Sequence, residues 1–464
     1  MRKRAFEDDI PGAGQTDSVK NSRWSLSYKE WYGAGPVGSW CDEALSVRFG
    51  DRSNRMKNKQ NRLLVAVLVT ALIGMGRDAV PAQTDTGHPA HFVGSEACKG
   101  CHARDYNDWK QTRMANVVRD PREYPEAVLG DFSNPDPVRT FTLEDVAFVY
   151  GSRYKQRYFT KRGDDYYPLP AQWDIAKKHW LPYHVEAGAD WWVPHYGPSN
   201  FDRPTGPTCD GCHSVNYDIA TKTVTEWNVG CEKCHGPGSK HVAHPTKSNI
   251  VNPETLDAIR GNDVCMQCHS QGQPLNNPID GKYYDWPVGF RPGERLADFW
   301  RLEELKPGTT NFYQYADLTA HKNRMQGNDF VQSTMYHRQL RCFDCHDVHS
   351  NRNESNLIEK GNELCLGCHN RQNPAGLKGT VSEYTHHAEG SAGSECVACH
   401  MPHIEQTIKD SYVAAHTFRF ISPVESEQSG IPNPCTSCHA DKTNAWAIEA
   451  LKKWQNVSPW RVAN

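Results

Sequence analysis

The chain has 464 residues, with 52 basic and 55 acidic side chains and a formal net charge of −3. This near-neutral balance gives no reason to expect a nucleic-acid partner. Hydrophobic residues make up only 38% of the chain while aromatic residues reach 10%, which excludes a disordered chain and indicates that something besides aliphatic side chains fills the core.

A secretory signal is predicted over residues 56–82. Basic residues precede the apolar run 63–76, and small residues at Val80 and Ala82 form a cleavage site. This run is shorter than the roughly 20 residues that a membrane-spanning helix needs. We therefore expect cleavage after Ala82, with a retained anchor as the alternative, and interpret residues 1–55 as an extension added by a mis-assigned start.

Sixteen of the 17 cysteines lie in eight copies of one string, Cys-x-x-Cys-His. Numbered 1 to 8 in chain order, the motifs are Cys98, Cys101 and His102; Cys209, Cys212 and His213; Cys231, Cys234 and His235; Cys265, Cys268 and His269; Cys342, Cys345 and His346; Cys365, Cys368 and His369; Cys396, Cys399 and His400; and Cys435, Cys438 and His439. Their spacing is uneven, so no solenoid repeat is predicted. The closely set motifs 2 and 3, and 5 and 6, indicate a doubled two-motif unit.

The motif has a specific chemical meaning. Its two thiols form thioethers to the porphyrin vinyl groups while the adjacent imidazole reaches the iron, so the string is the attachment signature of c-type haem. Zinc is the main alternative, but zinc sites do not require a histidine after every second cysteine. A thioredoxin-like dithiol needs one motif, and disulfide pairing leaves the eight histidines without a role. The sequence predicts eight covalently attached c-type haems whose iron is bound by the eight motif histidines.

We expect a mainly α fold with long loops and a small β-hairpin region, organised around covalent haems that replace much of the aliphatic core. Between motifs 1 and 2, aromatic segments at 148–159 and 166–169 flank a Gly163-Asp164 turn. This pattern predicts a β-hairpin. A Trp-rich stretch follows, and we expect it to serve packing, with a docking or substrate face as the alternative.

Two further elements are predicted from motif-free stretches. Residues 294–305 have a helix-like pattern, and Trp446, Ile448 and Leu451 recur at helical spacing in an amphipathic closing helix over 441–455. The expected segments are the extension 1–55, the signal 56–82, the first haem segment 83–130, the aromatic insert 131–207, the three-haem segment 208–274, the wrapping segment 275–340, the four-haem segment 341–440 and the C-terminal amphipathic helix 441–464.

Histidines beyond the motifs supply candidate second axial ligands. The 22 histidines leave fourteen outside the motifs, more than the eight that would close every iron. An iron closed by two histidines suits electron transfer, whereas an open position permits catalysis, so the surplus favours mostly closed haems. Met114 and Met335 are alternative axial ligands that otherwise pack against porphyrin. The candidate distal iron ligands, with ordinary surface histidines as the alternative, are His349, His387, His416, His244 and His321.

Four segments around the motifs carry a family resemblance. They are 93–102, 227–238, 335–349 and 386–402, with Cys-His-Asp-Val-His at 345–349 and Cys-His-Met-Pro at 399–402 as the most specific strings. From Phe92 to about Trp454 the chain resembles secreted bacterial multihaem c cytochromes of the cytochrome c-552/4 type. The resemblance implies electron relay, and related octahaem enzymes oxidise hydroxylamine or reduce nitrite or tetrathionate.

The chain departs from one enzymatic pattern of these relatives. It has no Cys-x-x-Cys-Lys motif, whose lysine serves the catalytic haem of nitrite-reducing relatives. The hydroxylamine-oxidising branch keeps histidine in its motifs and adds a tyrosine cross-link, so that interpretation stays open.

The favoured function is that of a periplasmic or otherwise extracytoplasmic electron carrier rather than an enzyme. The alternatives are an octahaem oxidoreductase that acts on nitrite, hydroxylamine or tetrathionate at one open haem, with no catalytic residue assigned, and an extracellular conductive filament. The expected partners are redox proteins that donate and accept electrons, including a membrane quinol-oxidising complex. Membrane contact is expected only if the signal is retained.

Overall fold

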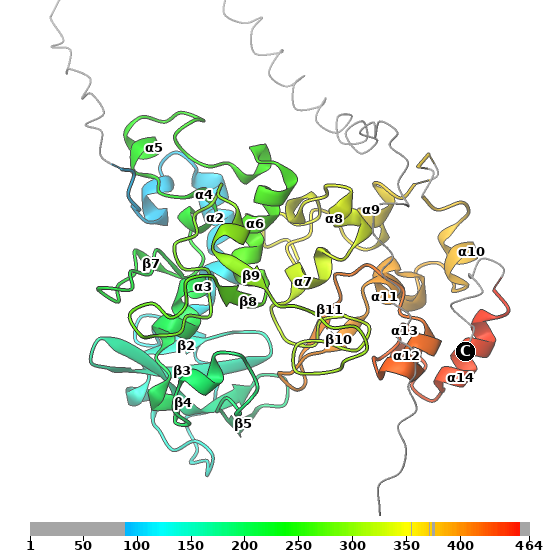
Figure 1. Ribbon diagram of the computed structural model, residues 1–464, viewed down its shortest axis with the longest axis horizontal. Coiled ribbons are helices and arrows are strands. Elements are labelled where there is room, and N and C mark those ends of the chain that lie inside the picture. Colours follow the sequence, from blue (N-terminus) through cyan, green and yellow to red (C-terminus); the bar gives the residue numbers. More distant parts are fainter. Residues whose placement is uncertain (1–88, 354, 371, 374–375, 455–464) are drawn as a thin grey trace, which may run out of the picture. The chain divides into compact units, whose positions relative to one another are not determined.

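The computed structural model describes residues 89–353, 355–370, 372–373 and 376–454, which all belong to one structural unit (Figure 1). The predicted extension, signal and cleavage site lie outside the described residues. Within the described ranges, no helix has the length and apolar character needed to cross a membrane.

The largest sheet has five antiparallel strands in the order β1-β2-β3-β4-β5 (Figure 1). They are β1 (Val118–Arg119), β2 (Phe148–Tyr150), β3 (Lys155–Arg162), β4 (Asp165–Asp174) and β5 (His179–Pro182). The predicted hairpin is confirmed as β3 and β4, which turn at Gly163-Asp164, where Gly163 has a φ of 61° that glycine adopts without strain. The sheet is larger than expected because short flanking segments pair onto this hairpin.

Aromatic side chains pack both faces of the sheet. Successive residues of a strand point to opposite faces, so Tyr158 joins Trp173 and Trp180 on one face while Phe159 joins Tyr150 on the other. Burying one such ring contributes about 1.5–3 kcal/mol. Trp173 and Trp180 therefore serve packing, as the sequence predicted.

The helices are short, and several end at a motif histidine. Those that do are α3 (Gly211–His213), α4 (Glu232–His235), α6 (Ala258–His269) and α11 (Cys396–His400). The others are α2 (Ala103–Lys110), α5 (Ser239–Ala243), α7 (Gln326–Phe330), α8 (Thr334–His337), α9 (Asn362–Leu366), α10 (Val381–Thr385), α12 (Pro423–Ser429), α13 (Pro434–Cys438) and α14 (Asn444–Leu451). Short helices joined by long loops agree with the expected fold class.

Three small two-stranded sheets complete the regular structure. They pair β6 (Ser214–Val215) with β7 (Glu226–Trp227), β8 (Gly272–Pro274) with β9 (Trp300–Leu302), and β10 (His403–Glu405) with β11 (Tyr412–Ala414).

The helix predicted over 294–305 is wrong. This stretch forms a 3₁₀ turn at Leu296–Asp298 and then strand β9. Its Trp300 pairs across to Pro274, donates from Nε1 to Ser270 at 3.2 Å and lies in a buried cluster with Leu296. Tertiary pairing and burial of the indole outweigh a weak helical pattern.

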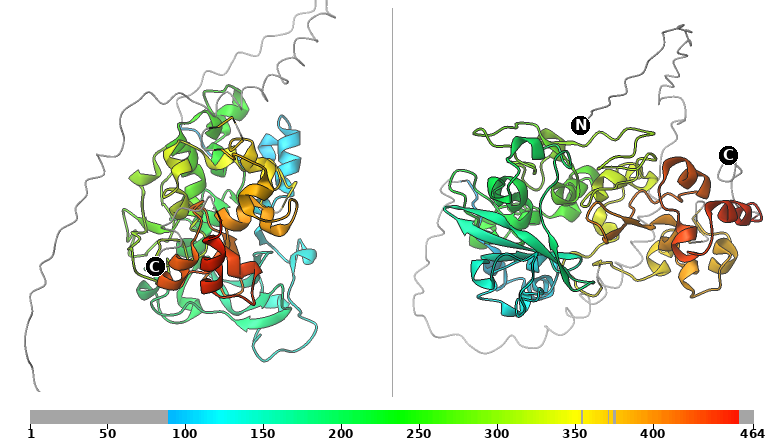
Figure 2. Two further views of the ribbon diagram at one scale, coloured as in Figure 1. Left: turned by 90° about the vertical axis from the view of Figure 1, so that its right-hand side faces the viewer. Right: turned by 90° about the horizontal axis from the view of Figure 1, so that it is seen from below.

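The predicted closing helix is confirmed as α14, over fewer residues than expected. Thr443 caps its start by accepting a hydrogen bond from the Trp446 amide at 3.2 Å. Ile448 and Leu451 are buried, and α14 contacts α12 and α13. Figures 1 and 2 both show these last helices, coloured orange to red, grouped away from the five-stranded sheet.

Candidate functional site

Four motif histidines each lie opposite a second histidine. When two imidazole nitrogens bind one metal, each at a distance of about 2 Å, the two nitrogens lie about 4 Å apart. The centres of the two rings then lie about 6 Å apart. Four pairs of rings have this spacing, with interplanar angles between 13° and 37°. The pairs are His102 with His241 at 6.3 Å, His235 with His349 at 6.1 Å, His346 with His416 at 6.5 Å and His439 with His387 at 6.2 Å.

Backbone carbonyls hold the Nδ1 atoms of several of these rings. The contacts run from His235 to Val251 O at 2.7 Å, from His346 to Ser355 O at 2.8 Å, from His241 to Thr246 O at 3.0 Å, from His387 to Thr385 O at 2.6 Å and from His416 to Ala414 O at 2.8 Å. A histidine that binds metal usually donates its other N–H in this way, which fixes the ring and leaves Nε2 for the metal. The donor chemistry of these pairs therefore fits haem iron.

The structure brings three of the five predicted distal candidates to a motif histidine. These are His349, His387 and His416. His244 is not brought to motif 1; His241, three residues earlier, faces it and was missed by the sequence analysis. The His321 ring contacts Tyr315, and its Nδ1 lies 2.9 Å from Asn311 O, so a backbone carbonyl fixes this ring as in the paired histidines. Within the described part of the chain, however, His321 stacks on no motif histidine.

The other motif histidines have different surroundings. At motif 7, the Tyr384 hydroxyl lies 3.4 Å from His400 Nε2 and the two rings are stacked. Among the described residues, no second histidine ring stacks opposite His213, His269 or His369. At motif 2, burial lowers the pKa of His213 to about 4.

Cysteines of different motifs touch one another. The hydrogen bond between two such thiols is the largest cause of their pKa shifts. It raises the pKa of Cys98, Cys268, Cys265 and Cys365 and lowers the pKa of Cys231, Cys212 and Cys396. The contacting thiols are Cys98 with Cys231, Cys212 with Cys268, Cys265 with Cys342, and Cys365 with Cys396.

A second set of cysteines lies close enough to interact through charge. Burial is the main cause of the raised pKa in each of these thiols, and a cysteine of the next motif contributes to it. The pairs are Cys234 with Cys265, Cys345 with Cys368, and Cys399 with Cys435. Taken together, the two sets connect the motifs in the order 1-3-4-5-6-7-8, with motif 2 joined to motif 4.

Two motif cysteines are exposed. They are Cys101, the second cysteine of motif 1, and Cys438, the second cysteine of motif 8. Their part in haem attachment stays a prediction.

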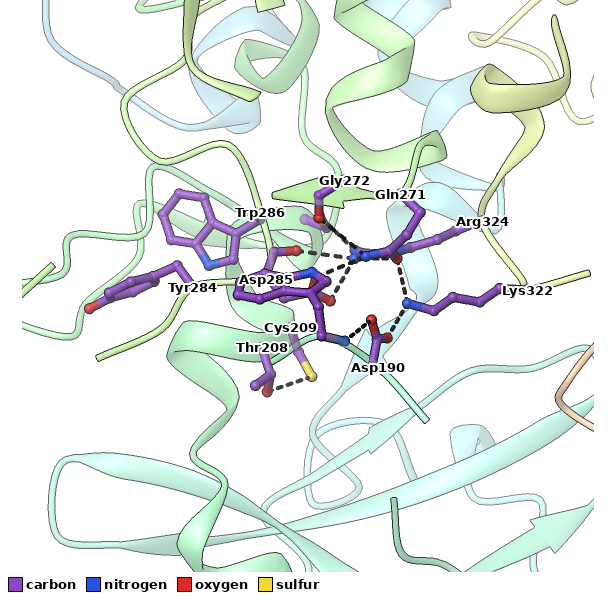
Figure 3. Close-up of polar contacts among 12 residues, drawn as sticks. Asp190, Thr208, Cys209, Gln271, Gly272, Tyr284, Asp285, Trp286, Lys322 and Arg324 are labelled. Atoms are coloured by element: carbon purple, nitrogen blue, oxygen red, sulfur yellow. Dashed lines mark hydrogen bonds and ion pairs between the residues drawn. The ribbon is translucent and has the colours of Figure 1, made fainter. Parts of the chain in front are cut away.

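A buried polar network lies beside motif 2 (Figure 3). Arg324 donates to Asp285 at 2.6 Å and to Gln271 at 3.1 Å, and Lys322 donates to Asp190 and to the same Gln271 oxygen. Figure 3 shows these side chains converging from separate loops next to the segment that carries Cys209.

The charges of this network balance. Two cations face two carboxylates, so the cluster has no net charge when all four are ionised. Burial raises the pKa of Asp285 to about 6, despite the opposing effect of Arg324 and Lys322. The guanidinium of Arg324 also reaches motif 2, with Nη1 3.8 Å from Cys212 Sγ. This network was not predicted from the sequence, because its members are scattered from Asp190 to Arg324 and form no local motif.

Tight packing surrounds the chain at motif 2. A π-helical turn, Gly206–Asp210, carries Cys209 into α3. Trp286 donates from Nε1 to Gly206 O at 2.9 Å, and its ring lies so close to Gly211 that an added Cβ would overlap it. Only glycine fits at this position of the motif.

Comparison with known proteins gives the family. The family model described as the doubled CXXCH motif matches residues 337–374, which contain motifs 5 and 6. The dissimilatory sulfite reductase MccA of Wolinella succinogenes is 22% identical over 405 residues, covering 68% of this chain and 51% of the relative. The multiheme cytochrome MtrA of Shewanella baltica is 24% identical over 216 residues, covering 43% of this chain and 61% of the relative. The chain is a multihaem c-type cytochrome.

A solved structure shares the fold of this cytochrome. The outer cell wall cytochrome OcwA superposes with a TM-score of 0.63 at 23% identity, over 79% of this chain and 87% of OcwA. The matched region spans only 51% and 61% of the lengths of MccA and MtrA. The cytochrome carries covalently bound c-type haems.

Proposed function

We propose that the cytochrome holds eight haems, one on each motif, and relays electrons along them in the order of the cysteine contacts. Haem iron exchanges single electrons between its ferrous and ferric forms. Each cysteine sulfur would bond to the edge of a porphyrin, so contacting sulfurs such as those of Cys265 and Cys342 would bring two porphyrin edges together. The observation that carries this proposal is that direct contacts and charge interactions between cysteines together link all eight motifs.

The paired histidines support a relay over an enzyme. His241, His349, His416 and His387 are proposed as the second axial ligands at motifs 1, 3, 5 and 8, where they exclude small molecules from the iron. The remaining candidates, His244 and His321, stay predictions without an assigned motif. Motifs 1 and 8 stand at the two ends of the series, so both ends carry a proposed closed iron.

We further propose an extracytoplasmic location, with redox proteins as donors and acceptors at the ends of the series. The exposed cysteines Cys101 and Cys438 belong to the two end motifs, so a haem on either motif would present an edge to such partners. The predicted signal over 56–82 and the name of OcwA as an outer cell wall cytochrome support this location. A membrane quinol-oxidising complex remains the proposed upstream donor.

Intact-mass measurement of the purified holoprotein tests the haem count. We expect the mass of the polypeptide plus eight haems, and the loss of one haem when both cysteines of one motif are replaced by serine. A wild-type mass with fewer haems would contradict the proposal.

A second candidate function is reduction or oxidation of a small anion at motif 2. Buried Lys322 and partly buried Arg324 lie beside this motif, no second histidine among the described residues stacks on His213, and one relative is named a sulfite reductase. We rank it second because Asp190 and Asp285 already neutralise both cations.

Anion binding distinguishes the two functions. If motif 2 is a substrate site, sulfite or nitrite should change the visible spectrum of the holoprotein. Arg324→Lys, which keeps the charge but loses the planar guanidinium, should weaken that change. The surface variant Arg260→Lys is the control. If neither anion changes the spectrum, the second candidate function is contradicted and the relay is the function that remains.

A further inference from the structure

Three motifs carry a polar residue that reaches into another motif. Ser95, Asn262 and Asn362 each stand three positions before the first cysteine of their own motif, at motifs 1, 4 and 6. Each accepts a hydrogen bond from the backbone N–H of the first cysteine of a different motif. Ser95 and Asn262 are almost fully buried, so these bonds are made away from water.

The Asn262 side chain makes two hydrogen bonds to the backbone at motif 5, an arrangement called here a two-point grip. Its Oδ1 accepts from the Cys342 amide at 2.9 Å, and its Nδ2 donates to Leu340 O at 3.1 Å. Oδ1 also lies 3.2 Å from Cys342 Sγ. One amide side chain therefore fixes both the start of motif 5 and the residue two positions before it.

Asn362 repeats this grip on motif 7. Its Oδ1 accepts from the Cys396 amide at 2.7 Å, and its Nδ2 donates to Ser394 O at 2.8 Å. The gripped positions, the first cysteine and the residue two before it, are the same as in motif 5. Two independent segments of the chain thus use one geometry.

At motif 3 the two equivalent hydrogen bonds come from two different side chains, Ser95 and Trp109. The Ser95 hydroxyl accepts from the Cys231 amide at 2.8 Å, and Trp109 Nε1 donates to Val229 O at 2.9 Å. Val229 again stands two positions before the cysteine.

The chemistry explains why these residue types occur. The first amides of a helical turn have no partner within the turn, and serine and asparagine are favoured acceptors for them. Cys231 precedes α4, Cys342 begins a 3₁₀ turn and Cys396 begins α11. Here the cap comes from another motif instead of from the helix's own preceding residue.

The three pairs of motifs joined by these hydrogen bonds are also joined by direct cysteine contacts. Motif 1 meets motif 3 through Cys98 and Cys231, motif 4 meets motif 5, and motif 6 meets motif 7, always first cysteine to first cysteine. We propose that Ser95, Asn262 and Asn362 are positioning residues that lock haem attachment sites together in the pairs 1/3, 4/5 and 6/7. This inference deepens the proposed relay and rests on it, because a fixed pair of attachment sites keeps the interval between two haems constant.

The chain contains a matched control for this role. Asn228 stands at the same place before motif 3, but its side chain accepts from the Val118 amide at 2.6 Å and donates to the Val118 carbonyl at 2.9 Å, so it binds one residue of β1 instead of another motif. A loss of Asn228 should disturb a strand and leave the interval between haems unchanged.

The test is electron paramagnetic resonance of the oxidised holoprotein, with haem content measured by intact mass. Irons held close together broaden each other's signals. We expect Asn262→Ala to keep the full haem content and lose the broadening from one pair, Asn262→Ser to restore it as Ser95 does at motif 1, and Asn228→Ala to leave it unchanged.

Each other outcome has a fixed meaning. A wild-type spectrum retained in Asn262→Ala, or the same loss in Asn228→Ala, would overturn the lock. If Asn262→Ala fails to load haem, Asn262→Ser decides: wild-type signals support the lock, and failure of this variant too contradicts it. No broadening in the wild-type protein would contradict the proposed relay, and with it the lock.

Discussion

Two histidines three residues apart, His241 and His244, have different neighbours. The His241 ring lies opposite His102 and is held through Nδ1 by Thr246 O, whereas the His244 amide and carbonyl serve the local turn. A histidine becomes an iron ligand through the direction of its ring, which the spacing in the sequence leaves undetermined.

This difference predicts opposite results for two alanine variants. His241→Ala should open the iron at motif 1, adding a high-spin signal and one haem that binds carbon monoxide in the reduced holoprotein. His244→Ala should leave the spectrum as in the wild type. Carbon monoxide difference spectra measure both, and a new carbon monoxide-binding haem in His244→Ala alone would contradict the assignment.

At the scale of single elements, the five-stranded sheet contains a buried ion pair. Lys155 and Asp174 face each other at 2.5 Å at one end of the β3–β4 ladder, with side chains 6% and 1% exposed. Burial opposes ionisation of Asp174, but the hydrogen bonds from Lys155 and from the Lys177 amide outweigh it and lower its pKa.

Asp174→Asn should destabilise the fold in a pH-dependent way. Both side chains are almost fully buried, and the substitution leaves the Lys155 charge buried without its partner, so we expect a loss of about 3–5 kcal/mol. Because the folded pKa is lowered, this stability is present above the unfolded pKa of about 3.9 and is lost as the pH falls through the folded value.

Thermal unfolding at pH 7 and pH 3 checks the size and the sign. The difference between wild type and Asp174→Asn should shrink at pH 3. Asp410→Asn, which breaks the exposed pair with Lys177, should cost no more than about 1 kcal/mol. A larger difference at pH 3 than at pH 7 would reverse the sign we expect.

The glycine before the second cysteine gives a second test at this scale. Gly211 in motif 2 lies against Trp286, whereas Gly100 in motif 1 has open space where a Cβ would go. Gly211→Ala should cost about 1–3 kcal/mol through overpacking, with a lower melting temperature or incomplete haem content at motif 2. Gly100→Ala should match the wild type in both measurements, and equal effects from the two variants would contradict the packing argument.

Local patterns in the sequence predicted local features well. The eight motifs, the β3–β4 hairpin and α14 each depend on residues close together in the chain. The stretch 294–305 failed because its conformation depends on a partner strand about 26 residues earlier.

Contacts between residues far apart in the chain could not be predicted from the sequence. His349 closely follows His346 in the chain but lies opposite His235 of motif 3, and the network of Lys322 and Arg324 draws on distant loops. The exposure of Cys101 and Cys438 depends in the same way on which motifs pack together.

The positioning residues could not be predicted from the sequence either. Serine and asparagine before a motif are common residues, so the positions of Ser95, Asn262 and Asn362 carried no signal until the contacts were known.

At the scale of the whole molecule, the contacts make one branched series of motifs. Motif 4 has three neighbours: motifs 3 and 5 along the series, and motif 2 at the branch beside the charged network. In the proposed relay every haem would be reached from either end, so electrons delivered at one motif would distribute over all eight.

Coulometric titration of the purified holoprotein tests this account most directly, because it counts the electrons that each chain takes up. We predict eight electrons per chain, taken up and released reversibly. A smaller number in a protein whose mass includes eight haems would mean that the series is interrupted, and would contradict the continuous relay.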